Sequence, residues 1–126
     1  MRTAFAGLLL FVPMATAVAC GYCVEDKVAA AYDHTVIVRS LGRRHEVAFF
    51  AVEGLIASGP GARREIHNAL ESTRGVDRGT ARVSPDGTAL SFAYDPVRQK
   101  LGPITRALEK SLAPRALNIS LLRVLK

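Results

Sequence analysis

The chain contains two cysteines, and they form one Cys-x-x-Cys motif, Cys20-Gly-Tyr-Cys23. Thiols at this spacing have three chemical interpretations, and the sequence leaves all three open. The pair can close a local disulfide, whose loop is so short that it would add little stability. The two thiolates can bind a soft metal ion, either Cu(I) or Zn(II). Cys20 can also be acylated, since Ala17-Val-Ala-Cys20 matches a lipobox imperfectly, with Ala17 where Leu is usual.

No second set of reactive residues has a catalytic or metal-binding spacing. His34, His45 and His67 are too irregularly spaced for one metal site, and isolated surface histidines are usually solvated. The sequence has no Ser/His/Asp arrangement, no glycine-rich phosphate loop and no pair of acids on one rigid element. Redox catalysis by Cys20 and Cys23 would need a thioredoxin-like βαβ unit before the motif, which is absent. We therefore expect a protein that is not an enzyme, with Cys20 and Cys23 as its metal-site residues.

Residues 1–19 have the organisation of a secretory signal peptide. They contain a basic Arg2, an apolar middle and a small-x-small end at Ala17-Val-Ala19. Cleavage after Ala19 would make Cys20 the first residue of the exported chain. We expect a periplasmic or secreted protein, and membrane contact only where Cys20 is acylated to give a lipoprotein.

Residues 46–126 show the periodicities of a small α+β domain. The chain has 126 residues, of which 49% are hydrophobic, so it can bury one core. Short apolar runs of strand length alternate with stretches in which apolar residues recur every three or four positions. The expected strands and helices occupy, in order, residues 46–52, 62–73, 76–83, 88–94, 103–112 and 117–125. Two helices at those places on a four-stranded antiparallel sheet predict a ferredoxin-like βαββαβ fold.

Four short motifs within this domain occur in the register of a known family. They are Val52-Glu-Gly54, Asn68-Ala-Leu70, Arg74-Gly-Val76 and Ala93-Tyr-Asp-Pro96. The pattern resembles the heavy-metal-associated (HMA) domain family, which includes small copper chaperones and the N-terminal modules of metal-pumping ATPases. The resemblance covers about residues 46–125 and implies the ferredoxin-like fold.

The metal site of that family does not carry over to this chain. The family binds its metal through a Cys-x-x-Cys on the loop after the first strand. Here that loop runs from Gly54 to Gly61, with Ala57 and Pro60 at the two cysteine positions. The resemblance therefore implies the fold and leaves Cys20 and Cys23, in a different segment, as the thiol pair.

The segment over residues 20–45 is expected to hold the Cys-x-x-Cys motif and one extra helix, over residues 24–41. Apolar residues follow helical spacing there, although Thr35-Val-Ile-Val38 favours a strand by propensity. The first strand of a ferredoxin-like sheet is already paired on both edges, so a helix is the better prediction. That helix would cover the second sheet face, formed by Val47, Phe49, Ala51, Ala89, Ser91, Ala93, Leu122 and Val124. The alternative is a homodimer, or another protein partner, bound through that face.

The position of this helix yields a hypothesis about the site. A helix of that length spans about 27 Å, and the strand that follows runs back over about 23 Å. If the two are antiparallel, the start of the helix returns to the loop between Gly54 and Gly61. Cys20 and Cys23 would then lie where the HMA family holds its metal, and the helix dipole would lower the pKa of their thiols.

The basic charge sets the expected partners. The formal net charge is +6, and the arginines are scattered without a dense run or interleaved aromatic residues. We expect a solvated basic surface and no nucleic-acid partner, with an acidic protein or an anionic membrane surface as the alternative.

Together these observations predict an exported small protein that binds or delivers a soft metal ion, copper or zinc, through Cys20 and Cys23. The alternative function is a non-catalytic interaction or accessory module that keeps the HMA-like fold and binds no metal.

Overall fold

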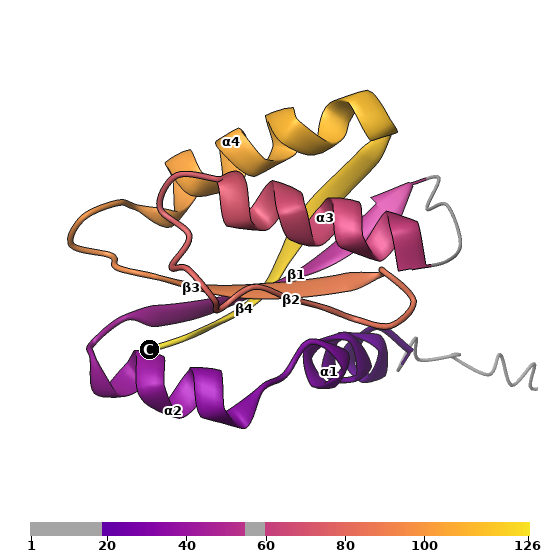
Figure 1. The fold of residues 1–126 in the computed structure, drawn as a ribbon. Helices are drawn as coiled ribbons and strands as arrows, with labels where there is room; N and C mark the ends of the chain where they lie inside the picture. The colour runs from indigo at the N-terminus through magenta and orange to yellow at the C-terminus, as the bar shows by residue number, and fades with distance from the viewer. Residues whose placement is uncertain (1–18, 55–59) are drawn as a thin grey trace, which may run out of the picture.

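The computed structural model describes residues 19–54 and 60–126 (Figure 1). The predicted signal peptide, residues 1–19, lies outside the described residues except for Ala19. Ala57, one of the two positions that match the cysteines of the HMA family, also lies outside them. None of the helices in the described ranges has the length and apolar character needed to span a bilayer. The elements are α1 (Ala19–Ala30), α2 (His34–Gly42), β1 (Glu46–Gly54), α3 (Pro60–Ser72), β2 (Arg82–Val83), β3 (Ala89–Tyr94), α4 (Leu101–Leu112), the short 3-10 helix η1 (Ala113–Arg115) and β4 (Leu117–Leu125).

The four strands form one antiparallel sheet in the order β2-β3-β1-β4. The helices α3 and α4 cover one face of the sheet, and α1 and α2 lie on the other face (Figure 1). This strand order and the placement of α3 and α4 confirm the predicted α+β class and ferredoxin-like βαββαβ fold. They also match the fold implied by the resemblance to the HMA family.

Alternating residues of β1 point into two separate cores, as its strand pattern predicts. Ala48, Phe50 and Val52 pack with α3 and α4, and the Phe50 and Phe92 rings stack with centroids 5.6 Å apart. Val47 and Phe49 point to the other face and pack against α1 and α2.

The helices α1 and α2 cover the second sheet face, which was the face considered for a homodimer. Val28, Ala31 and Ile37 are buried there against Val47, Phe49, Ala89 and Ala93. Val124, which was assigned to this face, packs in the first core instead. The β1–β4 register shifts between Phe49 and Phe50, and such an irregularity exchanges the faces of the residues that follow.

The single helix predicted over residues 24–41 is wrong, because the structure has two helices with a break at residues 31–33. Asp33 has an extended backbone, and its carboxylate accepts a hydrogen bond from the Val36 N–H at 3.2 Å. This is the geometry of a helix N-cap, so a new helix starts here. The β-branched run Thr35-Val-Ile-Val38 is helical within α2, as the pairing of β1 on both edges required.

The strand predicted over residues 76–83 is also shorter than expected, since β2 contains only Arg82 and Val83. Gly79 has φ +76°, a left-handed conformation that interrupts an extended strand. The Ala93 N–H is bound by the Thr80 hydroxyl oxygen at 3.1 Å, in place of a backbone carbonyl. The sheet therefore has a very short edge strand beside α3.

Candidate functional site

The two cysteines lie in α1, whose bounds are Ala19–Ala30. The side chains of residues 19–23 lie outside the described part of the structure, so the backbone alone places the motif. Positions three apart on an α-helix are surface neighbours, with Cβ atoms about 5–6 Å apart. The helical backbone therefore puts Cys20 and Cys23 on one side of α1, a spacing at which two sulfurs can share one metal ion.

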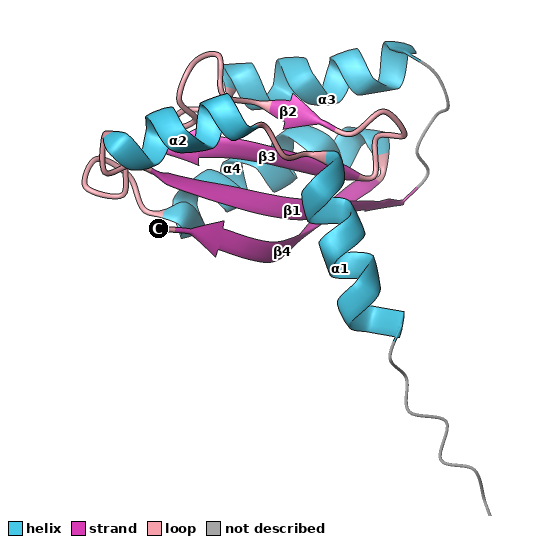
Figure 2. Ribbon diagram, turned by 90° about the horizontal axis from the view of Figure 1, so that it is seen from below, coloured by secondary structure: helices cyan, strands magenta, loops and turns pink. Residues whose placement is uncertain are grey.

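Contacts at three points fix α1 across the strands. In its last turn, the Lys27 Nζ donates to the Thr88 carbonyl at 3.4 Å. Just after its end, the Ala31 carbonyl accepts a 2.6 Å hydrogen bond from the Ser91 hydroxyl on β3. Nearer its start, the Arg123 guanidinium on β4 pairs with Glu25 and lowers the pKa of that carboxyl. The helix thus runs from β4 at Glu25 to β3 at Ala31, and its start extends past β4 (Figure 2).

This crossing corrects the geometry expected from one long helix. The break at residues 31–33 turns the chain, so that α2 runs back along β1 while α1 crosses the strands (Figure 2). The Lys27–Thr88 contact does lie where β1 ends, because the Thr88 carbonyl also accepts from the Val52 N–H at 2.8 Å. In Figure 2, the start of α1 points away from the last residue of β1 and from the first turn of α3. The proximity of the cysteines to residues 55–59 stays a prediction, since those residues lie outside the described ranges.

The three histidines have partners in the folded chain. The His45 Nδ1 lies 2.5 Å from an Asp77 carboxylate oxygen, and the His45 Nε2 lies 3.7 Å from Asp95. His34 contacts the Tyr32 hydroxyl, and His67 lies 3.8 Å from Glu71. Among the described side chains, those of residues 24–54 and 60–126, no group of three or more His, Asp or Glu residues could hold a metal ion.

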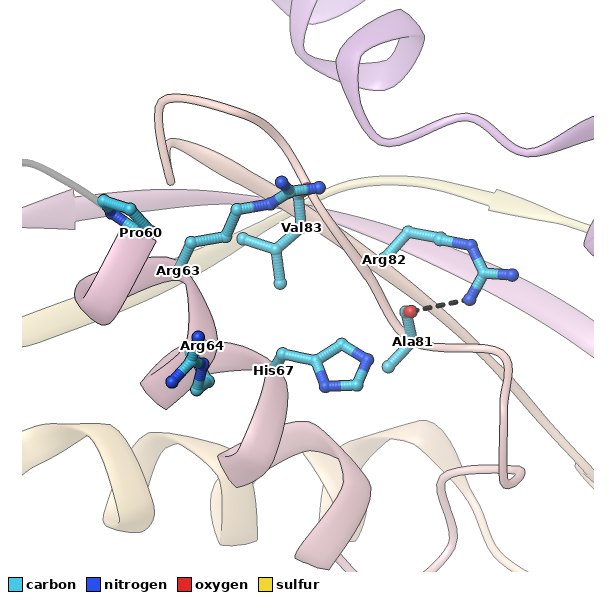
Figure 3. A pocket seen from close by; sticks show the side chains of 7 residues that line it. All are labelled: Pro60, Arg63, Arg64, His67, Ala81, Arg82 and Val83. Carbon is cyan, nitrogen blue, oxygen red and sulfur yellow. Dashed lines mark hydrogen bonds between the residues drawn. The ribbon is translucent and has the colours of Figure 1, made fainter.

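One feature is not evident from the sequence: arginines that are scattered along the chain gather along the β2 edge of the sheet. A pocket of about 380 Å³ lies between α3 and β2 (Figure 3), and a second of about 420 Å³ lies between α2 and the loop before β2. Six arginines line these two pockets: Arg39, Arg43, Arg63, Arg64, Arg78 and Arg82. They come from four separate segments, so no run in the sequence indicates them. We call this set the basic edge.

Comparison with known proteins gives similarity in structure only. No protein-family model and no curated protein matches the chain. Oxidized MerP from Ralstonia metallidurans CH34 is 15% identical over 63% of this chain and 99% of its own, with a TM-score of 0.48. The CopZ metallochaperone is 20% identical over 59% and 98% of the two chains, with a TM-score of 0.44. A ZiaAN sub mutant is 21% identical over 60% and 96%, with a TM-score of 0.45. The fold therefore rests on the strand order, and the function has to be drawn from the residues of this chain.

Proposed function

We propose that this protein binds a soft metal ion, Cu(I) or Zn(II), through the thiolates of Cys20 and Cys23, and that its role is not catalytic. The observation that supports the proposal is the position of both cysteines one turn apart in α1. The helix is fixed to the domain through the buried Val28 and through the contacts at Lys27 and Ala31. The helix that carries the motif is therefore attached to the domain through its last turn.

The donor set favours transfer of the ion over permanent storage. Thiolate sulfur is a soft ligand and prefers Cu(I) and Zn(II) to hard cations. Zn(II) in a structural site takes four ligands, and this pair provides two. A site of two sulfurs leaves coordination positions open, and ligands of a recipient protein can occupy them.

The same proposal includes export. Removal of residues 1–19 would leave Cys20 at the start of the mature chain, in an oxidising compartment where the thiol pair can also close a disulfide. The oxidised pair would release a metal ion, because a disulfide sulfur has no thiolate charge.

Metal uptake by the reduced protein tests the function. The purified chain is loaded without oxygen with Cu(I) or with Zn(II), and bound metal is counted by native mass spectrometry. We expect a single ion on the wild-type chain and none on Cys20→Ser/Cys23→Ser. His34→Ala is the control, because His34 is an exposed residue that follows α1, and it should bind metal as the wild type does.

Equal uptake by the wild type and the double serine variant would end the metal proposal. Intact mass of the exported protein separates the other states of the pair, since a disulfide, an acyl chain and free thiols each give a different mass. A chain without metal affinity would leave the interaction module as the function, and the basic edge is the observation that favours it.

A further inference from the structure

We propose that the basic edge docks an acidic, extended segment of a partner protein. This inference does not depend on metal binding, since it uses none of the residues of α1. It rests on the two pockets beside β2, on the charges that line them and on the way the edge strand is covered.

The first pocket places basic side chains of α3 beside β2 (Figure 3). The Arg63 Nε donates to the Val83 carbonyl at 3.2 Å, and its other two guanidinium nitrogens bind no described residue. Arg64 is exposed and forms no ion pair or side-chain hydrogen bond within the described ranges. His67 lies on the same helix and faces the pocket beside Ala81 (Figure 3). The first turn of α3 contains no acidic residue, so its backbone adds positive potential at this end.

The second pocket lies on the other side of the same edge. Arg39 and Arg43 come from the end of α2 and from the turn after it, and Arg78 comes from the loop before β2. All three are exposed, and none forms an ion pair in the part of the chain that the structure describes. The acid in this pocket, Asp77, has its carboxylate bound to His45.

The basic edge therefore carries charge that the described residues do not neutralise. Of its six arginines, Arg82 alone has a carboxylate partner there, Asp33 at 3.0 Å. Like charges gathered in this way repel one another, and an anionic partner relieves the repulsion. The planar guanidinium fork also matches a carboxylate in shape, which gives the site geometric as well as electrostatic preference.

The covering of the edge strand indicates how the partner binds. The Val83 carbonyl is occupied by Arg63, and the Ala81 and Gly79 carbonyls accept from Arg82 at 2.8 and 3.1 Å. These carbonyls cannot add a further strand without displacing the arginines, which is a common protection of sheet edges. The guanidinium groups, and not the backbone carbonyls, are therefore the groups that would bind the partner. Because they lie in two pockets on opposite sides of one edge, an extended segment with several carboxylates can reach both.

Binding of a labelled hexaglutamate peptide tests this inference, measured by fluorescence anisotropy at low and at physiological ionic strength. Arg39→Glu/Arg64→Glu reverses one charge in each pocket without removing a hydrogen bond of the described structure. Arg106→Glu/Lys110→Glu makes the same change in net charge on the exposed face of α4. We expect the first variant to bind about tenfold more weakly, the second to change by less than about threefold, and the wild-type affinity to fall as salt is added.

Three results would overturn the inference: equal weakening by both variants, no peptide binding at all, or arginine-dependent binding of inorganic phosphate or phosphatidylglycerol vesicles but not of the peptide. Thermal unfolding by circular dichroism confirms that each variant is folded. Peptide binding by Cys20→Ser/Cys23→Ser should equal that of the wild type, and Arg39→Glu/Arg64→Glu should still take up metal. A failure of docking and a failure of metal binding are therefore distinguishable.

Discussion

Replacing Ser91 by alanine should release the helix that carries the thiol pair from the sheet. Ser91 and Ala31 are each only 3% exposed, and the Ser91 hydroxyl donates to the Ala31 carbonyl at 2.6 Å. That carbonyl accepts no other hydrogen bond within the described residues. The substitution removes a bond with a net contribution of about 1 kcal/mol and leaves a buried acceptor unpaired at a cost of about 1–3 kcal/mol. We expect the free energy of unfolding to fall by about 2 kcal/mol, and Tm to fall by about 10 °C.

Urea unfolding followed by circular dichroism measures the loss, and hydrogen exchange shows where it acts. Amides of α1 should exchange faster in Ser91→Ala, while those of α3 and α4 change only with the global stability. Ser120→Ala is the control, because Ser120 is an exposed serine on β4, and it should alter stability by less than about 0.5 kcal/mol. A loss in Ser91→Ala no larger than in this control would refute the role of Ser91 as the tether of α1.

Two further predictions concern the ends of the central strands. Gly54→Ala should cost more than about 3 kcal/mol or prevent folding, because Gly54 has φ +120° and an added Cβ would lie 2.2 Å from the Ala116 carbonyl oxygen. Gly42→Ala has no atom within 4 Å of its Cβ and should be tolerated when the two are compared by thermal unfolding. The Asp86 carboxylate accepts hydrogen bonds from the Ser84 hydroxyl and from Thr88, and these bonds lower the pKa of Asp86 to about 2. The carboxylate therefore stabilises the fold at any pH above the unfolded pKa, which is near 3.9. This stabilisation is lost as the pH falls through about 2. Asp86→Asn should therefore lose about 1 kcal/mol at pH 7, after allowance for solvent screening, and much less as the pH falls to about 2 and below. A difference that does not change with pH in urea titrations would contradict this assignment.

The fold was predictable because its signals are local. The β1 run alternates two apolar sets, and both sets find a core on the expected side. The break at Asp33 was missed because the apolar spacing continues on both sides of it. An Asp three residues before Val36 is itself an N-cap signal, and weighing it above the periodicity would have predicted two helices.

The basic edge was not predictable in the same way, because it depends on which segments meet. Arg39 and Arg43 belong to the N-terminal segment, while Arg63 and Arg64 open a helix that lies on the opposite face of the sheet. Their approach to one strand follows from the order β2-β3-β1-β4, which puts β2 at the edge. The arginine spacing in the sequence contains none of this information. The thiol pair was the opposite case, since its proposed chemistry needed only one residue type, cysteine, at one spacing.

The two candidate sites lie at opposite edges of the sheet, and the fold explains the separation. The helix α1 crosses β4 at Glu25, so the end that carries Cys20 and Cys23 extends beyond that edge (Figure 2). At the other edge, β2 contains only Arg82 and Val83, and arginines bind carbonyls in this strand and just before it. Arg63 both protects a carbonyl and brings a charge that no described carboxylate pairs, whereas the charge of Arg82 is already paired with Asp33. A partner held at β2 would therefore lie at the opposite edge of the sheet from the start of α1, and the proposed docking and metal transfer would not compete for one surface.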